Sequence, residues 1–344
     1  MRFAFAVINV LSTSSGTPSG DIVSHTVVAT EAVSPHVRLI RGPIGTGFVA
    51  IYVVLGRRTA LVDTGFAQHP VSTIGPGLAT IGLTLREVDL ILTTHAHPDH
   101  VGGHASVVSA SDATVGVHPA DQLRMDGLWK RPVPDDDFLA DFHAVGLQHR
   151  TEERIASLLA DAGRPVIVEL TLRDGDRIDL GAGVALDVVH TPGHTGGSLT
   201  YLIQPDMTAL VGDAIQGLGG GSGLPLYEDP EAYLSSLARI GELGVPMVGL
   251  GHRFRSRHLV GASPVVEGRS LAALLEESGS FPPIADQVAR EVVAARYPSD
   301  KGAICAFLQG LPAPFDGHDA DLGAIGEASL HAALLHIERA RTLL

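Results

Sequence analysis

The feature that most constrains the fold is a cluster of metal-binding side chains directly after a predicted buried strand. The strand covers residues 88–92, and residues 94–103 then read T-H-A-H-P-D-H-V-G-G. In α/β proteins a loop in this position opens at the carboxyl edge of a sheet. Imidazole and carboxylate groups are ligands for zinc, iron or manganese. Alternation in an extended loop sends His95 and His97 to one side and leaves Asp99 and His100 for another, which suits two adjacent ions.

Composition alone seldom produces such a segment. With 17 histidines in 344 residues, the pattern H-x-H-x-D-H arises by chance in roughly three of a thousand similar chains. A solvated turn rich in histidine is the simpler interpretation of the motif by itself. More distant residues argue against that interpretation, because each of them also follows a predicted apolar strand: Asp63, His194, Asp213 and His252.

The ordered set resembles the five motifs of the metallo-β-lactamase superfamily across about residues 31–260. This resemblance implies an α/β fold, an αββα sandwich with the metal site at one end. It implies that a first metal ion is bound by His95, His97 and His194. It also implies that a second ion is bound by Asp99, His100 and His252, and that the carboxylate of Asp213 bridges the two ions. Asp63 and His190 resemble residues that lie behind the ligands and orient them.

The resemblance also implies a chemistry. Two divalent ions, Zn²⁺ by ligand type with Mn²⁺ or Fe²⁺ as alternatives, would share a hydroxide that attacks a carbonyl or phosphoryl centre. Asp99 would be the catalytic side chain that orients this nucleophile and receives a proton. The cysteine ligand of true β-lactamases is replaced by Asp213, which favours glyoxalase II-like and lactonase-like hydrolases. We therefore expect cleavage of a small ester, thioester or lactone.

Two other activities of the same fold compete with this expectation. One is phosphodiester cleavage, as in ribonuclease members, and the other is a mononuclear iron dioxygenase that acts on persulfides. The formal net charge of −14 argues against nucleic acid as a partner. The complete second ligand set argues against a mononuclear site. A small-molecule substrate is expected, and an anionic one if Arg253, Arg255 or Arg257 binds it. Pairing of these arginines with surface acids is the alternative.

The chain divides into three predicted parts. Residues 1–30 form an N-terminal extension, residues 31–260 the catalytic domain, and residues 261–344 a helical, winged-helix-like subdomain that closes the cleft or forms a homodimer contact. A helical insertion is expected at about residues 119–164. Residues 1–20 fit a weak signal peptide, a strand or a start-site artefact. No segment is long and apolar enough to span a membrane, and the single cysteine favours a cytoplasmic location over secretion.

Hydrophobic patterns and turn residues predict the individual elements. Strands are expected at residues 37–40, 48–55, 59–62, 88–92, 166–170, 177–180, 184–190, 198–203, 207–211 and 246–250. Helices are expected at residues 78–87, 151–162, 231–243, 270–277, 284–295 and 327–344. Two glycine-containing segments, residues 42–47 and 217–223, are predicted as loops near the site.

Overall fold

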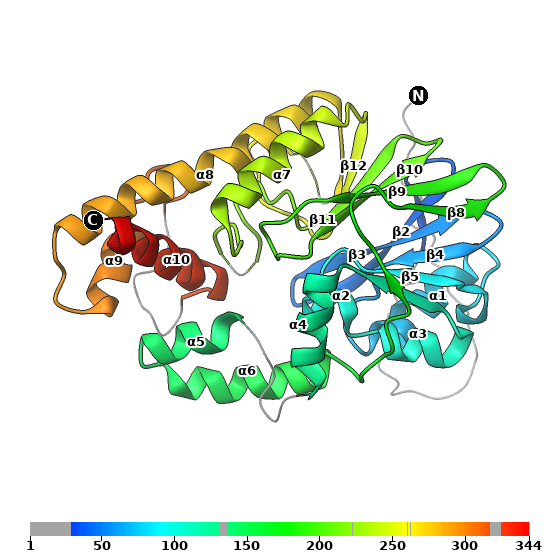
Figure 1. Cartoon of the computed structure of the whole chain (residues 1–344), viewed down its shortest axis with the longest axis horizontal. Coiled ribbons are helices and arrows are strands. Elements are labelled where there is room, and N and C mark those ends of the chain that lie inside the picture. Colours follow the sequence, from blue (N-terminus) through cyan, green and yellow to red (C-terminus); the bar gives the residue numbers. More distant parts are fainter. Residues whose placement is uncertain are drawn as a thin grey trace, which may run out of the picture.

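The structure is a computed structural model that describes residues 29–130, 137–221, 223–259, 261, 263–316 and 325–343. The expectations for residues 1–20 lie outside the described residues. Within the described part, two β-sheets pack face to face and helices cover both outer faces (Figure 1). This arrangement confirms the predicted αββα sandwich. No described helix has both the length and the apolar character needed to cross a membrane.

The first sheet joins an antiparallel half to a parallel half. Its described strands follow one another in chain order, antiparallel through the fourth strand and parallel from there on. They are β1 (Glu31–Ala32), β2 (Val37–Ile44), β3 (Gly47–Leu55), β4 (Thr59–Val62), β5 (Leu90–Leu92), β6 (Thr114–Val117) and β7 (Leu170–Thr171). Because β4, β5 and β6 are parallel, the segments that follow them meet at one edge of the sheet.

The second sheet has the described strand order β13-β12-β11-β10-β9-β8. Only the pair β11 and β12 is parallel among its described strands. The strands are β8 (Arg177–Gly181), β9 (Val184–His190), β10 (Leu199–Gln204), β11 (Thr208–Gly212), β12 (Met247–Leu250) and β13 (Val265–Glu267). The carboxyl ends of β11 and β12 therefore also lie side by side.

The strands are apolar at nearly every position because both faces of each sheet are covered. In β3, Tyr52 and Val54 pack between the sheets, whereas Ile51 and Val53 pack under the outer helices. Side chains of successive strand residues point to opposite faces, so a strand covered on both sides needs apolar residues at every position. The inter-sheet core and the two outer cores thus hold the layers together.

Helices cover the outer faces unequally. The first sheet is covered by short segments, η1 (Pro70–Ile74), α1 (Gly75–Ala79), η2 (Leu85–Glu87) and α3 (His104–Ser111). The second sheet shares one apolar core with longer helices, α7 (Pro230–Glu242), α8 (Gly268–Ala294), α9 (Asp300–Gly310) and α10 (Glu327–Leu343). The remaining described helices are α2 (Pro98–Val101), α4 (Pro119–Lys130), α5 (Asp137–Ala144) and α6 (Gln148–Asp161). The last three make the predicted insertion helical.

The two sheets meet at the edge where the motif segments emerge. The backbone N–H of Ala50 in β3 donates to the carbonyl of Gly251, at 2.7 Å. Val49 and His252 form an isolated antiparallel bridge. The residues that follow β12 are thus fixed against the first sheet, which brings the ends of both sheets to one place.

Several predicted elements are wrong in detail. The expected helix at residues 78–87 is broken into the end of α1 and the single turn η2, because the chain turns at Gly82 with φ +78°. Residues 42–44 belong to β2 rather than to a loop, and the turn narrows to Gly45 and Thr46. The predicted strand at residues 166–170 pairs only over β7.

The C-terminal prediction also needs correction. Two helices were expected where α8 runs without interruption through Pro282 and Pro283. Proline inside a helix costs about 3 kcal/mol or more, and here Phe281, Pro282 and Ala285 are buried, which offsets that cost. Helix α9 was not predicted, although Ser299 caps it by accepting from the N–H of Gly302. β12 is not the last strand, because β13 follows it.

The core shared by the second sheet and the C-terminal helices gives a stability prediction. Phe281 is 0% exposed and its ring lies 4.8 Å from that of Phe315. Phe281→Ala is expected to lower the free energy of unfolding by about 3–5 kcal/mol, because it leaves a cavity in this core. Urea unfolding measures the change. Tyr297→Ala, at a side chain 46% exposed, is the control, and equal effects of both changes would contradict the shared core.

Candidate metal centre

The structure brings together all seven side chains that the sequence predicts as ligands. They come from the segments that follow β5, β9, β11 and β12, with Asp99 and His100 in the short helix α2. Three overlapping groups have their ligand atoms within 4.8 Å of one another, namely His95, His97 and His194; His95, His100 and Asp213; and Asp99, His100 and His252. The convergence follows from strand order, since each segment leaves its sheet at the edge shared by both sheets.

The predicted first set is compact. Nε2 of His194 lies 3.1 Å from Nε2 of His95 and 3.0 Å from Nδ1 of His97. Nitrogen ligands about 2.0–2.1 Å from a tetrahedral zinc ion lie roughly 3.3–3.4 Å from each other. Nε2 of His194 is therefore separated from each of the other two nitrogen atoms by nearly the distance that one such ion requires.

The predicted second set contains a carboxylate as well as two imidazoles. Nε2 of His252 lies 3.1 Å from Nε2 of His100 and 3.1 Å from Oδ2 of Asp99. Nδ1 of His252 donates to the carbonyl of Phe48 at 3.0 Å, so its Nε2 faces the other ligands. This set has the mixed nitrogen and oxygen donors that suit divalent metal ions.

Asp213 lies between the two sets. Its Oδ2 is 3.7 Å from Nε2 of His194 and 3.5 Å from Nε2 of His252. Its Oδ1 is buried and has no hydrogen-bond partner. A Cβ on Gly251 would lie 2.2 Å from this Oδ1, so only glycine leaves room for the carboxylate. An unsatisfied buried carboxylate oxygen is costly, and a cation beside it would remove that cost.

The first set also fits a metal ion on hydrogen-bonding grounds. Nδ1 of His194 donates to the carbonyl of Leu226 at 2.7 Å. The Thr94 hydroxyl donates to Asp63, so it can only accept from Nδ1 of His95, at 3.1 Å. Both imidazoles therefore carry their proton on Nδ1, and their two Nε2 lone pairs face each other. A cation between them turns this repulsion into coordination, so the residues present fit the ions.

A family model described as metallo-beta-lactamase superfamily matches residues 44–252. The matched span covers more than half of the chain and contains all seven converging residues. The chain belongs to the metallo-β-lactamase superfamily. Members of this superfamily are typically metal-dependent hydrolases, and the His and Asp groups described above could hold metal ions.

Two relatives in sequence illustrate the match. A hydroxyacylglutathione hydrolase of Acidiphilium cryptum is 29% identical over 223 residues, which are 62% of this chain and 88% of that protein. An uncharacterized protein of Mycobacterium tuberculosis is 31% identical over 137 residues, 38% of this chain and 53% of that protein. The second match thus spans about half of its relative.

Solved structures show the same fold. A metallo-beta-lactamase family protein from Thermus thermophilus has a TM-score of 0.66 at 24% identity, covering 91% of this chain and 95% of its own. BJP-1, a subclass B3 metallo-beta-lactamase of Bradyrhizobium japonicum, has a TM-score of 0.53 at 19% identity. The match covers 78% of this chain and 96% of BJP-1. At these identities the likeness concerns the fold alone.

Electrostatics differ between the two sets of this metallo-β-lactamase fold protein. Burial lowers the pKa of His95 and of His194 well below the usual range, and neighbouring imidazoles lower it further. Burial would also lower the pKa of His252, but Asp213 and Asp99 outweigh it and raise this pKa to about 10. His95 and His194 are therefore neutral, whereas Asp99 and Asp213 concentrate negative charge around His252 that attracts a proton or a divalent ion.

Asp63 lies behind the ligands, as the resemblance implied. Its Oδ1 accepts from the N–H of Thr94 at 2.8 Å, and its Oδ2 accepts from the Thr94 hydroxyl at 2.7 Å and from Nδ1 of His100 at 2.8 Å. The residue is 2% exposed and has φ +63°, a left-handed backbone conformation uncommon outside glycine. Asp63 thus orients His100 directly and His95 through Thr94.

His190 lies farther from the ligands than Asp63. Its Nε2 donates to the carbonyl of Gly196 at 3.0 Å, and its ring stacks on that of His118 at 4.3 Å. It contacts the segment that carries His194 rather than His194 itself. Its expected role in orienting ligands stays a prediction.

Two residues near the ligands were missed by the sequence analysis. Asp121, in the first turn of α4, is 1% exposed and accepts from the N–H groups of Ala96 and Gly197 at 2.7 and 2.9 Å. The side-chain amide of Gln216 donates to the carbonyl of Leu226 and accepts from the N–H of Leu226. These two hydrogen bonds fix the carbonyl that orients His194. Asp121 was detectable, because it comes shortly after the apolar strand β6. Gln216 lies three residues after Asp213, and no sequence pattern marks it as a residue near the ligands.

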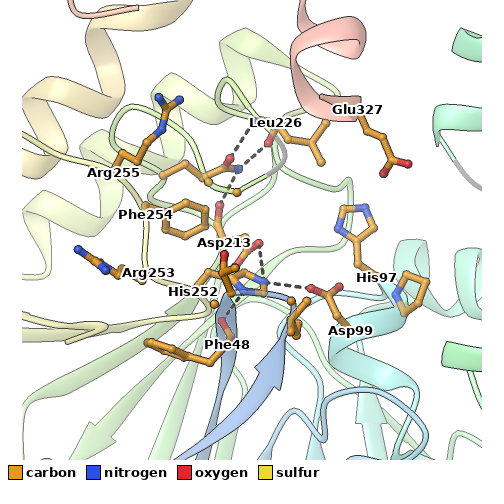
Figure 2. A pocket seen from close by; sticks show the side chains of 18 of the residues that line it. Phe48, His97, Asp99, Asp213, Leu226, His252, Arg253, Phe254, Arg255 and Glu327 are labelled. Carbon is orange, nitrogen blue, oxygen red and sulfur yellow. Dashed lines mark hydrogen bonds and ion pairs between the residues drawn. The ribbon is translucent and has the colours of Figure 1, made fainter. Parts of the chain in front are cut away.

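The three arginines predicted to bind substrate differ in their contacts. Arg255 donates to the carbonyls of Leu218 and Gly223 at 2.7 and 2.9 Å. Nε of Arg257 donates to the buried carboxylate of Glu277 at 2.9 Å. Arg253 is exposed and lines the cavity above the ligands. In Figure 2 its guanidinium lies on the side opposite His97. Substrate binding by each of them stays a prediction.

A cavity of about 890 Å³ opens over the predicted ligands. Figure 2 shows Asp99, Asp213 and His252 at its floor, with Phe254 and Leu226 above them. The turn between β2 and β3 and the glycine-rich segment around Gly220 also line it, as predicted for loops near the site. Across the cavity, Arg154 of α6 pairs with Glu327 of α10 at 3.5 Å.

The C-terminal helices hold the glycine-rich segment in place. The N–H of Gly217 donates to Oγ of Ser278 in α8 at 2.8 Å, and the N–H of Leu224 donates to Oγ of Ser329 in α10 at 3.2 Å. The hydroxyl of Tyr227 lies 2.9 Å from Nε2 of His336 in α10. The segment that supplies the Leu226 carbonyl is therefore anchored from outside the matched family region.

His104 gives a pH prediction for the layer beneath the ligands. It is 0% exposed, its ring nitrogens contact the hydroxyls of Thr64 and Thr93 at 2.7 and 2.9 Å, and burial lowers its pKa from 6.5 to about 3. The unfolded chain binds a proton that the folded chain excludes, so the stabilisation present above pH 6.5 is lost as pH falls towards 3. His104 thus contributes up to about 1.4 kcal/mol per pH unit to the slope of the free energy of unfolding against pH.

Urea unfolding of the metal-free protein between pH 7 and pH 4 measures this contribution. His104→Gln keeps hydrogen-bonding groups but does not titrate, so its free energy of unfolding should fall less steeply with decreasing pH. Identical slopes for the two proteins would contradict a neutral buried His104.

Proposed function

We propose that this chain is a dinuclear metal-dependent hydrolase that cleaves a small ester, thioester or lactone. The observation that carries the proposal is the convergence of five imidazoles and two carboxylates around the unsatisfied Oδ1 of Asp213. His95, His97 and His194 would hold one ion, Asp99, His100 and His252 the other, and Asp213 would bridge them. Zn²⁺ is the first choice for these donors, and Mn²⁺ or Fe²⁺ accept the same set.

Two bound divalent ions would supply an activated water for attack and Lewis-acid polarisation of the scissile carbonyl. The chain's own part is to orient these groups and to handle protons. Burial would raise the pKa of Asp99, but His100 and His252 outweigh it and lower the pKa, so this carboxylate stays ionised. Its side chain is 24% exposed and lines the cavity. An ionised carboxylate at this position supports the proposal that Asp99 accepts a hydrogen bond from the attacking water and orients it.

The cavity favours an acyl substrate over a polynucleotide. Phe48, Phe66 and Phe254 line it close to the ligands and give an apolar surface for an acyl group. The name of the Acidiphilium cryptum relative, a hydroxyacylglutathione hydrolase, supports a thioester among the three bond types. The net charge of −14 disfavours a phosphodiester backbone as substrate. Arg253 is available at the rim for an anionic group on the substrate.

Metal content and substrate range test the proposal together. Anaerobically purified protein should contain close to two metal ions per chain. It should hydrolyse at least one lactone, ester or thioester in a panel that also includes a phosphodiester. His97→Ala removes one ligand of the first set, so activity should fall by more than the roughly 10–100-fold expected for a residue behind a ligand. Elemental analysis by mass spectrometry and initial rates measure the two quantities.

Other outcomes of the same experiment identify the competing functions. One iron ion per chain without hydrolysis would replace this proposal by persulfide dioxygenase activity. Turnover of a phosphodiester alone would replace it by phosphodiesterase activity.

Arg253 gives a prediction about substrate charge. Arg253→Ala should raise KM about 10-fold for an anionic substrate and leave KM for a neutral analogue nearly unchanged, since a charge-assisted hydrogen bond contributes about 1.5–3 kcal/mol. Steady-state kinetics with a matched anionic and neutral pair measures the difference. Arg58→Ala, at an exposed arginine in the turn between β3 and β4, is the control. An equal change for both substrates would exclude recognition of charge by Arg253.

A further inference from the structure

A second buried carboxylate, on a different element from Asp63, contacts the segments that carry the ligands. Asp121 belongs to α4, in the segment that the sequence analysis treated as an insertion, and it is 1% exposed. Its Oδ2 accepts from the N–H of Ala96 at 2.7 Å and from the hydroxyl of Thr195 at 2.9 Å. Its Oδ1 accepts from the N–H of Gly197 at 2.9 Å. Three donors thus meet one carboxylate that water does not reach.

The three donors come from the two segments that carry the predicted first set. Ala96 lies between His95 and His97, and Thr195 follows His194 directly. These segments are about a hundred residues apart in sequence, since His95 and His194 are separated by 99 positions. One carboxylate therefore fixes the backbone of both segments relative to each other, at the place where their imidazoles must converge.

The glycine at position 197 shows how closely the second segment approaches Asp121. A Cβ at Gly197 would lie 2.4 Å from Oδ1 of Asp121 and 2.6 Å from its backbone nitrogen. Any side chain there would push the segment away from the carboxylate. The glycine at position 197 is thus explained by this contact, without reference to a substrate.

Asp63 and Asp121 act on different parts of the ligand-bearing segments. Asp63 contacts the side chain of His100 and, through Thr94, that of His95. None of the interactions described for Asp121 involves a ligand side chain, and all of them hold the two segments that carry the first set. Buried carboxylates require donors to offset the loss of hydration, and charge-assisted bonds of this kind are strong and directional.

We propose that Asp121 is a positioning residue for the first metal ion, acting through the backbone next to His95, His97 and His194. The inference rests on the proposed two-metal site. It assigns the α4 segment a role in building that site, in addition to packing against the sandwich. Because Asp121 acts through other residues, its effect should appear in metal affinity before any substrate is present.

Zinc titration of the metal-free protein by calorimetry tests this role. Reference variants assign the binding phases: His97→Ala should abolish the phase of the first set, and His252→Ala that of the second. Asp121→Asn has nearly the same shape but places an NH₂ group against at least one N–H or O–H donor. It should weaken the first phase about 10–100-fold and leave the second within a factor of about three.

The control makes the same chemical change elsewhere. Asp112→Asn lies at an exposed carboxylate at the end of α3, where asparagine also tolerates the φ of +57°. Both phases should remain unchanged in this variant. Equal weakening of both phases by Asp121→Asn, or no weakening, would overturn the positioning role.

If Asp121→Asn does not fold, a less disruptive variant tests the positioning role of Asp121. Thr195→Val keeps the side-chain volume and removes one donor to Asp121, so it should weaken the first phase several-fold and spare the second. An unchanged first phase in this variant would then overturn the inference. Failure of the proposed hydrolase activity gives a different result: the wild-type protein would show both binding phases but no turnover of the carbonyl panel.

Discussion

Imidazole rings that face one another with their lone pairs impose the main constraint on this structure. Such rings repel each other unless a cation lies between them, so the fold must hold them in place from behind. It does so through Nδ1: His100 donates to Asp63, His194 to the Leu226 carbonyl and His252 to the Phe48 carbonyl. Phe48 lies in β3 and Asp63 follows β4, both in the first sheet, whereas Leu226 lies in the segment that follows β11 of the second sheet. The alignment of the two sheets at one edge is therefore a requirement of the site and not only of packing.

The same requirement explains why helices outside the family region matter. The Leu226 carbonyl lies in a segment that Gln216 brackets and that α8 and α10 anchor through Ser278 and Ser329. The apolar core of these helices is continuous with the outer face of the second sheet. The orientation of His194 thus depends on contacts made much later in the chain, at Ser278 and Ser329. The predicted boundary near residue 260 marks a change in secondary structure, and the core continues across it.

The sequence was sufficient for those features that depend on strand ends. Asp63, His95, Asp213 and His252 each follow an apolar strand, so their placement at one edge followed from the rule for parallel strands. Asp121 obeys the same rule after β6 but was hidden by the helical pattern that begins there. Gln216 and the contacts of Arg255 and Arg257 depend on how distant segments pack, and no local pattern encodes such packing. Two helices were predicted in place of α8 for a related reason. Proline locally disfavours the interior of a helix, but burial at Pro282 outweighs this preference.

The cavity walls and the metal ligands come from separate parts of the chain. The ligands occupy the ends of strands, whereas the walls come from the turn between β2 and β3, from α6 and from α10, with Arg154 and Glu327 paired across the opening. Wall residues that do not hold the Phe48 or Leu226 carbonyl can therefore change without disturbing the ligands. Natural selection can in this way change which molecule enters while the reaction is inherited intact.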